Sequence, residues 1–467
     1  MTRAPCQLSL AEAGELIRRR ALSPVELVDA VLARIDALNP TLNAFTTLVP
    51  LAEVRAAARD AEKEIAGGTY RGPFHGIPVG VKDLLDTAGI RTTYGSGMFR
   101  DHVPSVDAAV PARLRTGGAI IVGKTASHEF GKGITTNNYF YGATHNPWNL
   151  DHIPGGSSGG AAAAAAALLG PLQIATDGGG SIRLPAAFCG VVGLKPTIGL
   201  LSNRGHTGGG NSSFSVPGPM TRSVRDAAIA AEALAGFDPD YIYSRPDPVP
   251  DLVGGLERGA KGLRIGMGPD LLEPMPDPAV RTAYEAALRR LEGLGAGLVE
   301  IRLPHHDAVM RATMGVFAFE GDTLIEALLG DRTRLYSPEL LRMAERKPPA
   351  DPALWLRAQQ DRQRIRQDYA VAFETADVLV QPTTPFVAPR IDVEETSYIG
   401  RCVPYTAAAN LVGFPSVALP AGMVDGLPMS IQIIAPPGAD DLALRVAYAL
   451  EQAAPEHRVQ IPPLDGA

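Results

Sequence analysis

The first 70 residues carry apolar side chains at the spacing of amphipathic helices. Ser9 and Ser23 each precede apolar residues at intervals of three and four, and Pro24 follows the second serine. A serine side chain caps the first turn of a helix, and proline is tolerated at the first helical position, so both serines predict a helix start. We expect a helical segment over 1–70, with one helix at 51–65.

From about Gly76 the apolar residues gather in short runs bounded by glycine and proline. Such runs are typical of buried strands, and the longer periodic runs between them are typical of helices. We predict strands at 77–81, 119–122, 172–175, 190–194, 378–380, 416–419 and 430–434, and helices at 108–116, 160–169 and 440–452. A more charged, helical stretch is expected over 270–375. The alternation predicts an α/β fold.

Composition is that of a globular protein with many turns. The 50 glycines and 40 prolines make up about 19% of the 467 residues. This is above the usual ~12% but below the ~25–30% at which disorder is expected. With 45% hydrophobic and 20% charged residues, the chain can bury a sizeable core. The excess glycine and proline is therefore expected in turns and loops.

Charge and cysteine content exclude several function classes. The net charge is −7 and no five consecutive residues are basic, so direct nucleic-acid binding is not expected. Cys6, Cys189 and Cys402 form no CxxC pair, which disfavours a disulfide framework or a zinc site and favours a reducing cytoplasm. The small-apolar run at 161–169 is far shorter than the ~20 residues that span a bilayer. A soluble protein without a membrane segment is predicted.

Two short motif matches suggest other enzymes. Residues 118–125 fit the phosphate-binding loop GxxxxGK[ST], but the intervening Ala-Ile-Ile-Val predicts a buried strand, where backbone amides cannot wrap a phosphate. Residues 155–159 fit the GxSxG nucleophile elbow, with Ser157 as nucleophile and His206 among the later histidines available as base. Pro154 stands where the strand into the elbow should end. An α/β-hydrolase with this nucleophile stays open as a less favoured alternative.

A third pattern is longer and much more specific. It runs Pro-Gly-Gly-Ser-Ser-Gly-Gly over 154–160, then an alanine-rich helix, then Ala-Thr-Asp-Gly-Gly-Gly-Ser-Ile-Arg-Leu-Pro over 175–185. This stretch resembles the signature of the amidase signature family of serine hydrolases. The resemblance extends to His-Gly-Ile-Pro-Val-Gly-Val-Lys-Asp at 75–83, to 217–226, to Pro-Tyr-Thr at 404–406 and to Ala-Asn-Leu-Val-Gly-Phe-Pro at 409–415. It therefore covers most of the chain.

The resemblance implies a fold and a domain layout. The implied amidase-signature-type fold is a large mixed, twisted β-sheet core flanked by helices on both faces. One amidase domain is expected over 1–467. Its parts are the helical segment at 1–70, the signature core at 71–235, a helical insertion or cap at 270–375 and the C-terminal part of the core at 376–467.

The resemblance also implies a catalytic triad of Lys82, Ser157 and Ser181. A serine hydroxyl is a weak nucleophile at neutral pH and needs a base beside it. Burial among Pro-Val-Gly-Val can keep the Lys82 amine neutral. Ser181 is then the nucleophile, and Ser157, which follows a cis peptide bond in this family, is the relay. The implied reaction releases ammonia or an amine, leaves an acyl-enzyme that water hydrolyses, and needs no metal or organic cofactor.

Residues around the nucleophile have expected supporting roles. Glycines before a nucleophile let backbone N–H groups turn toward the substrate carbonyl. The expected oxyanion hole consists of the N–H groups of Gly178, Gly179, Gly180 and Ser181. Asp177 and Arg183 are expected to pin this loop through a charge-assisted hydrogen bond, and Ser158 to make a local hydrogen bond.

The substrate is expected to be a small-molecule amide. The candidate residues of its pocket are Met98, Phe99, Thr136 and Phe317. Gly178 stands where the family more often has a larger residue, which would either widen the pocket or loosen the oxyanion hole. Oligomeric state is left open, with a homodimer as one option.

The alternative function is the glutaminase-type role of the A subunit in a tRNA-dependent amidotransferase. In this family such subunits use the same fold to release ammonia from glutamine for a partner protein. The stretch 317–382 lacks the tyrosines after a Ser-Gly pair, and the basic run, that we associate with those subunits. Net charge does not decide, because the partner can carry the RNA contacts. A free-standing amidase is therefore the main prediction, and an inactive binding protein is disfavoured because the lysine and both serines are present.

Overall fold

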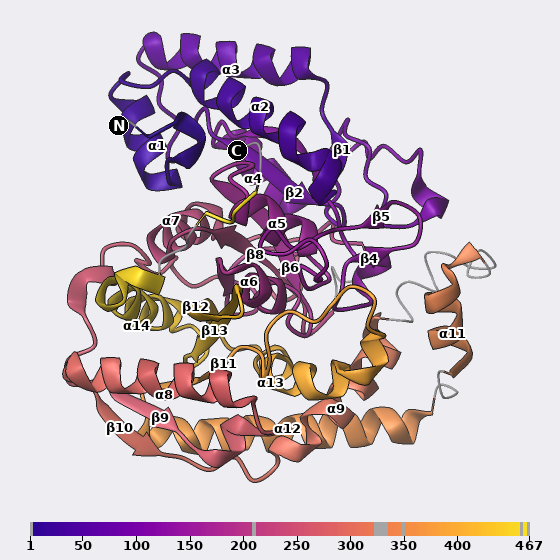
Figure 1. Cartoon of the computed structure of the whole chain (residues 1–467), viewed down its shortest axis with the longest axis vertical. Coiled ribbons are helices and arrows are strands. Elements are labelled where there is room, and N and C mark those ends of the chain that lie inside the picture. Colours follow the sequence, from indigo (N-terminus) through magenta and orange to yellow (C-terminus); the bar gives the residue numbers. More distant parts are fainter. Residues whose placement is uncertain (1–2, 208–211, 322–334, 347–350, 458–460, 465–467) are drawn as a thin grey trace.

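The fold is built on one large mixed β-sheet. The computed structural model describes residues 3–207, 212–321, 335–346, 351–457 and 461–464 (Figure 1). Within them, 11 strands pair in the order β1-β3-β2-β6-β8-β7-β12-β13-β11-β9-β10. The strands are β1 (Phe45–Leu48), β2 (Pro78–Lys82), β3 (Ile120–Thr125), β6 (Leu172–Asp177), β7 (Val192–Lys195), β8 (Val216–Thr221), β9 (Arg264–Met267), β10 (Gly297–Glu300), β11 (Val378–Pro382), β12 (Ser416–Val424) and β13 (Leu427–Ile434). A separate small hairpin pairs β4 (Asn137–Asn138) with β5 (Gly142–Ala143).

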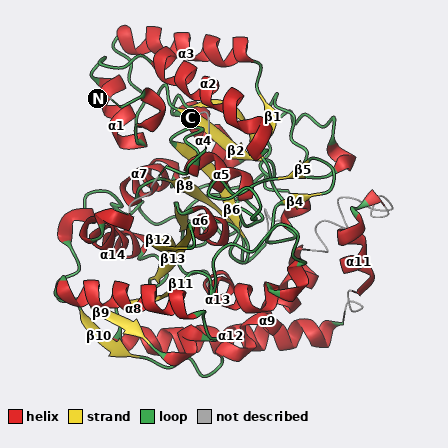
Figure 2. Ribbon diagram, viewed as in Figure 1, coloured by secondary structure: helices red, strands yellow, loops and turns green. Residues whose placement is uncertain are grey.

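Helices connect and cover the strands (Figure 2). They are α1 (Leu10–Arg18), α2 (Pro24–Leu42), α3 (Leu51–Ala66), α4 (Ala109–Thr116), α5 (Gly159–Ala166), α6 (Arg183–Cys189), α7 (Val224–Leu234), α8 (Pro278–Gly293), α9 (Val309–Val316), α11 (Pro338–Arg346), α12 (Pro352–Thr375), α13 (Ile399–Val412) and α14 (Asp440–Ala453). The predicted starts of the first two are confirmed: Ser9 Oγ accepts the Glu12 N–H at 3.1 Å, and Ser23 Oγ accepts the Val25 N–H at 3.0 Å. In Figure 1, α1, α2 and α3 lie at one end of the molecule, and α8 and α12 lie at the opposite end.

Alternating side chains of the strands supply a core on each face of the sheet. Val378 and Val380 of β11 belong to a large core that includes residues of α7 and α14. Leu379, between them, belongs to a second core with residues of α12 and α13. Because successive strand side chains point to opposite faces, helices cover both faces. The α/β fold with a large mixed sheet flanked by helices is confirmed.

Several strands depart from the predicted pattern. β1 lies in the segment expected to be helical over 1–70, and β10 lies in the helical stretch expected over 270–375. Both are four-residue edge strands, which contain few apolar residues and so give a weak signal. β8 is fully buried in the sheet although it contains Pro217 and Pro219. Proline cannot donate to a strand ladder and is normally confined to edges, so the sequence rule fails here.

The region expected as an insertion or cap is partly integral to the sheet. Besides β10, α8 packs against β11, β12 and β13. Its later helices, α9 and α12, pack on α13. The stretch 270–375 therefore contains the expected helices, α8, α9, α11 and α12, together with the strand β10.

The parallel strands β2, β3 and β6 end at the same edge of the sheet. Val81 on β2 opposes Lys124 on β3 and Ile174 on β6. In open α/β sheets, sites form outside the carboxyl ends of the strands. Lys82 and Asp177 are the last residues of β2 and β6, so the sheet brings these two charged residues to the edge where a site is expected.

Candidate active site

Lys82, the last residue of β2, lies beside the loop that carries Ser157 and leads into α5. Its Nζ lies 2.7 Å from Ser157 Oγ and 3.0 Å from Thr176 Oγ1. The Lys82 side chain is completely buried. Asp83, the neighbouring acid, instead accepts the Thr93 N–H at 3.0 Å. Lys82 thus contacts the predicted relay serine.

Burial makes the Lys82 amine a usable base. It lowers the pKa of Lys82 to about 7, although the negative charge of Asp177 acts in the opposite direction. An amine with this pKa is substantially neutral at physiological pH and can accept a proton. The hydrogen bonds from Lys82 to two hydroxyls orient its Nζ.

The loop that carries Ser157 is held by its backbone. The Gly156–Ser157 peptide bond is cis, as the resemblance implied. The Ser157 carbonyl accepts the His128 N–H at 3.1 Å. Thr136 Oγ1 donates to the Gly155 carbonyl at 2.9 Å and accepts the Gly159 N–H at 3.0 Å. Thr136, expected in the substrate pocket, is fully buried and braces this loop instead.

Ser158 and the residues before Ser157 help to decide whether Ser157 is a relay or the nucleophile of an elbow. Ser158 Oγ donates to the Thr176 carbonyl at 3.1 Å, which fits the expected structural hydrogen bond. Residues 153–156 form a loop rather than the strand that a nucleophile elbow requires. Burial and the nearby Lys82 lower the pKa of His206 to about 3. The local geometry therefore favours a relay over an elbow nucleophile.

Ser181 lies in the turn between β6 and α6, and it is partly exposed. The carboxylate of Asp177 organises this turn: it accepts the Gly180 N–H at 2.7 Å and the Ile182 N–H at 3.1 Å. The Gly180 N–H was expected in the oxyanion hole, but it is already bonded to this carboxylate. Gly180 has φ +131°, and a Cβ there would lie 2.2 Å from Thr406 Oγ1, so only glycine fits.

The predicted pair of Asp177 and Arg183 is present and fully buried. Arg183 Nε donates to the Asp177 carboxylate at 3.0 Å, and both side chains have 0% exposure. Burial acts to raise the pKa of Asp177, but Arg183 outweighs it and lowers this pKa to about 2. The carboxylate is therefore charged throughout the physiological range and holds the Ser181 turn.

Three residues that brace this turn had no predicted role. Asn410 Nδ2 donates to the Asp177 carbonyl at 2.9 Å, and Gln432 Oε1 accepts from Arg183 at 2.9 Å. Thr406 Oγ1 donates to the Gly179 carbonyl at 2.6 Å. The first and third lie in the segments 409–415 and 404–406, which carry part of the resemblance. The roles of Asn410 and Thr406 depend on how α13 packs, and that of Gln432 on the position of β13, which no sequence signal supplied.

The other three predicted substrate-binding residues lie in two places. A Cβ at Gly179 would lie 3.0 Å from the Phe317 ring, so Phe317 borders the oxyanion loop. Phe214 lies beside it, with ring centroids 4.7 Å apart. Met98 and Phe99 pack instead in an apolar cluster whose buried members are Leu84, Tyr94, Phe130, Tyr336 and Leu340.

The rejected phosphate-loop motif forms a buried strand, as predicted. Lys124 of this motif is completely buried in β3. Its Nζ donates to the Leu85 carbonyl and to Thr87 Oγ1, the latter at 2.7 Å. These contacts use the ammonium group that a phosphate would need. Cys189 is also fully buried, and burial raises the pKa of its thiol.

A family model described as Amidase matches residues 26–444. The chain belongs to the Amidase family. The A subunit of the glutamyl-tRNA(Gln) amidotransferase of Salinispora tropica is 38% identical to it, over 95% of this chain and 96% of the relative. The corresponding protein of Geobacter metallireducens is also 38% identical, over 96% and 98%.

Solved structures of Amidase-family enzymes superpose on the whole chain. A bacterial aryl acylamidase of the amidase signature family has a TM-score of 0.89 at 28% identity, covering 98% of this chain and 99% of its own. The peptide amidase of Stenotrophomonas maltophilia has a TM-score of 0.85 at 32% identity, covering 99% of both chains. The predicted family is confirmed, and the chain is an enzyme acting on amide C–N bonds. Among the described residues, no helix combines the length and apolar character that crossing a bilayer demands.

Proposed function

We propose that the protein hydrolyses an amide C–N bond through an acyl-enzyme on Ser181, with Lys82 as base and Ser157 as relay. The observation that carries the proposal is the 2.7 Å contact between Lys82 Nζ and Ser157 Oγ in a fully buried setting. A neutral amine can take the Ser157 proton while this serine takes the proton of the nucleophile. The turn held by Asp177 presents the nucleophile at the same edge of the sheet.

The proposed reaction has two steps. Ser181 Oγ attacks the carbonyl carbon while its proton passes to Ser157 and the Ser157 proton passes to Lys82. The oxyanion accepts backbone N–H bonds from the loop, where Gly179 and the nucleophile itself are the candidate donors. The proton returns through the relay to the leaving nitrogen, the C–N bond breaks, and ammonia or an amine departs. Water then attacks the ester by the reverse route and releases a carboxylate.

The curated relatives favour a different substrate from the one predicted from the sequence. Both are named as the A subunit of glutamyl-tRNA(Gln) amidotransferase, which supports the alternative function better than the free-standing amidase. The first candidate is therefore release of ammonia from the side-chain amide of glutamine, for use by a partner protein. Under this candidate the chain alone would be a weak glutaminase that a partner activates.

The second candidate is the free-standing amidase, and the aromatic pair beside the nucleophile supports it. Phe214 and Phe317 border Gly178 and Gly179, so an acyl group bound there would meet apolar rings. The free amino acid glutamine carries an ammonium and a carboxylate, which need charged or polar partners. An amide with an aryl or alkyl acyl group is better matched to these rings.

The two candidates are separated with the purified chain alone. Ammonia release is measured from glutamine, from phenylacetamide and from acetamide. Turnover of phenylacetamide well above that of glutamine supports the free-standing amidase, whereas glutamine turnover that appears only with added partner proteins supports the amidotransferase. The shared chemistry is tested with an aryl sulfonyl fluoride and intact-protein mass spectrometry.

The proposed mechanism requires that the aryl sulfonyl fluoride form a single adduct with the protein. Peptide mapping should locate this adduct at Ser181. Ser181→Ala is expected to lose both the adduct and at least ~99% of amide turnover, because no other group supplies the nucleophile. Ser397→Ala is the control, since this serine is exposed in η9 (Glu395–Ser397). Near wild-type turnover by Ser181→Ala would refute the assignment.

A further inference from the structure

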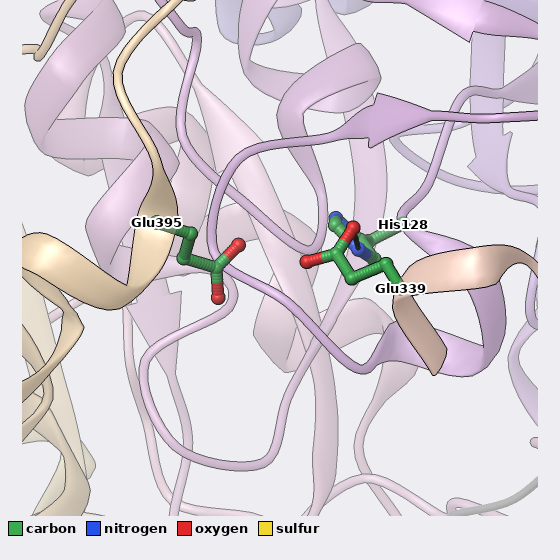
Figure 3. A group of neighbouring side chains, drawn as sticks. All are labelled: His128, Glu339 and Glu395. Carbon is green, nitrogen blue, oxygen red and sulfur yellow. Dashed lines mark ion pairs between the residues drawn. The ribbon is translucent and has the colours of Figure 1, made fainter. Parts of the chain in front are cut away.

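Three side chains from distant segments converge beside the Ser157 loop: His128, Glu339 and Glu395 (Figure 3). His128 precedes η3 (Glu129–Gly131), Glu339 lies in the first turn of α11, and Glu395 begins η9. One donor atom from each lies within 4.8 Å of the others. Figure 3 shows both carboxylates turned toward the region of the imidazole. The three groups form a set of one nitrogen and two oxygen donors.

The His128 ring faces the Glu339 carboxylate, and one oxygen of Glu395 is unpartnered. His128 Nδ1 pairs with Thr135 Oγ1 at 3.3 Å, which leaves Nε2 facing the Glu339 carboxylate at 3.6 Å. A hydrogen bond to the far ring nitrogen is the usual way a metal-binding histidine is oriented. Glu395 Oε2 is buried and has no hydrogen-bond partner among the described residues. A buried carboxylate oxygen without a donor is costly unless a cation occupies its neighbourhood.

The imidazole is also held in place sterically. Gly133 lies against its ring, and a Cβ at this glycine would fall 2.3 Å from His128 Cε1. The His128 side chain is 6% exposed, whereas that of Glu339 is 41% exposed. One ligand is therefore fixed from inside the protein, and another is reachable from solvent, which provides an entry path.

We propose that His128, Glu339 and Glu395 bind one divalent transition-metal cation, of which Zn²⁺ is the best match. Zinc takes one imidazole nitrogen and carboxylate oxygens at about 2.0–2.2 Å, which places tetrahedral ligands about 3.4 Å apart. The 3.6 Å separation of Nε2 and the Glu339 oxygen is close to this value. Rotation of the glutamate side chains closes the remaining separation, and water completes the tetrahedron.

The bound cation would fasten α11 and η9 to the relay loop. In Figure 1, α11 stands at the margin of the molecule. The His128 N–H donates to the Ser157 carbonyl at 3.1 Å, and a Cβ at Gly131 would lie 3.4 Å from Ser157 Oγ. A ligand on His128 is therefore connected to the backbone of Ser157 through this one hydrogen bond. The site is a structural clamp that does not touch the reacting atoms.

The experiment measures metal binding directly, so its outcome does not depend on amide turnover. The chelator-treated chain is titrated with ZnCl₂ at about pH 7.5 by isothermal calorimetry, because zinc binds only the deprotonated imidazole and binding weakens at lower pH. Co²⁺ is added in parallel, because its visible absorption reports the coordination geometry. His128→Ala and Glu395→Gln remove one ligand each, and the second keeps the shape of the side chain. Glu394→Gln and Glu345→Gln are matched controls, because these exposed glutamates lie next to η9 and on α11.

The wild-type chain and both controls are expected to bind one Zn²⁺ and to melt at a higher temperature when it is present. Each ligand variant is expected to bind at least about tenfold more weakly and to lose this thermal shift. Far-ultraviolet circular dichroism identifies any variant that fails to fold. If His128→Ala does not fold, the zinc affinity of Glu395→Gln decides the outcome. The proposal is overturned if the wild-type chain binds no Zn²⁺ up to about 1 mM, or if folded Glu395→Gln binds it as tightly as the controls.

Discussion

The most direct consequence of the site geometry is a pH dependence set by Lys82. Its pKa is lowered from 10.5 to about 7. At about 1.36 kcal/mol per pKa unit, this shift corresponds to about 5 kcal/mol of destabilised ammonium. At about pH 7.5, roughly 75% of such an amine is neutral, against ~0.1% of an ordinary lysine. Burial therefore raises the concentration of the active base several hundredfold.

The sign of the effect follows from which form of Lys82 is active. Below its pKa the lysine is an ammonium and cannot accept the Ser157 proton; above it the amine is neutral. We expect kcat/KM for amide hydrolysis to fall about tenfold per pH unit below about 7 and to be level above it. Lys82→Met should lower kcat/KM by ~10²–10⁴-fold, the usual contribution of a general base. Initial rates from about pH 5 to 9 measure both.

A second buried lysine provides the matched control. Burial also lowers the pKa of Lys195 to about 7, but its Nζ donates to the Pro196 carbonyl at 3.0 Å rather than to Ser157. Lys195→Met is therefore expected to keep the fall of kcat/KM below about pH 7. If this variant lost the fall, Lys82 would not be its source. The same conclusion would follow if Lys82→Met kept both the fall and an activity within about tenfold of wild type.

Two further predictions concern the Ser181 turn. Arg183→Met leaves Asp177 buried without its ion-pair partner, so the free energy of unfolding in urea should fall by ~3–5 kcal/mol. Arg245→Met removes an exposed ion pair and should change this free energy by less than ~1 kcal/mol. Equal effects would show that the buried pair does not hold the turn. Phe317→Ala should raise KM for phenylacetamide more than for acetamide, because its ring borders the oxyanion loop, and Phe319→Ala, whose ring pairs with Trp355, should leave this ratio unchanged. A uniform change in both KM values would contradict the proposed acyl contact.

Elements with a strong local pattern could be predicted, and elements stabilised by tertiary packing could not. The apolar run at 172–175 is the core of β6, and the alanine-rich run at 160–169 overlaps α5. In contrast, α13 continues through Pro404, a residue that normally ends or kinks a helix. Its buried residues contribute to the second core, and this packing offsets the lost backbone hydrogen bond. Such compensation is visible only in three dimensions.

The same division applies to the site. Lys82, Ser157 and Ser181 could be named because the motif around each is contiguous. Asn410 and Gln432 could not, since their contacts with Asp177 and Arg183 join positions more than 220 residues apart. The hydrogen bond that occupies the Gly180 N–H was missed for a related reason, because it depends on where the Asp177 carboxylate turns. Side-chain direction across a turn is not encoded in residue spacing.

The anchoring of the Ser181 turn by Asn410 and Gln432 has a consequence for biosynthesis. A nascent chain that has just passed Ser181 already contains every residue of the proposed triad. Its turn nevertheless lacks two of the side chains that hold it until α13 and β13 have emerged from the ribosome and docked. Hydrolytic competence should therefore arise only after α13 and β13 have been translated and docked, and a chain truncated before α13 should be inert although its nucleophile, relay and base are all present.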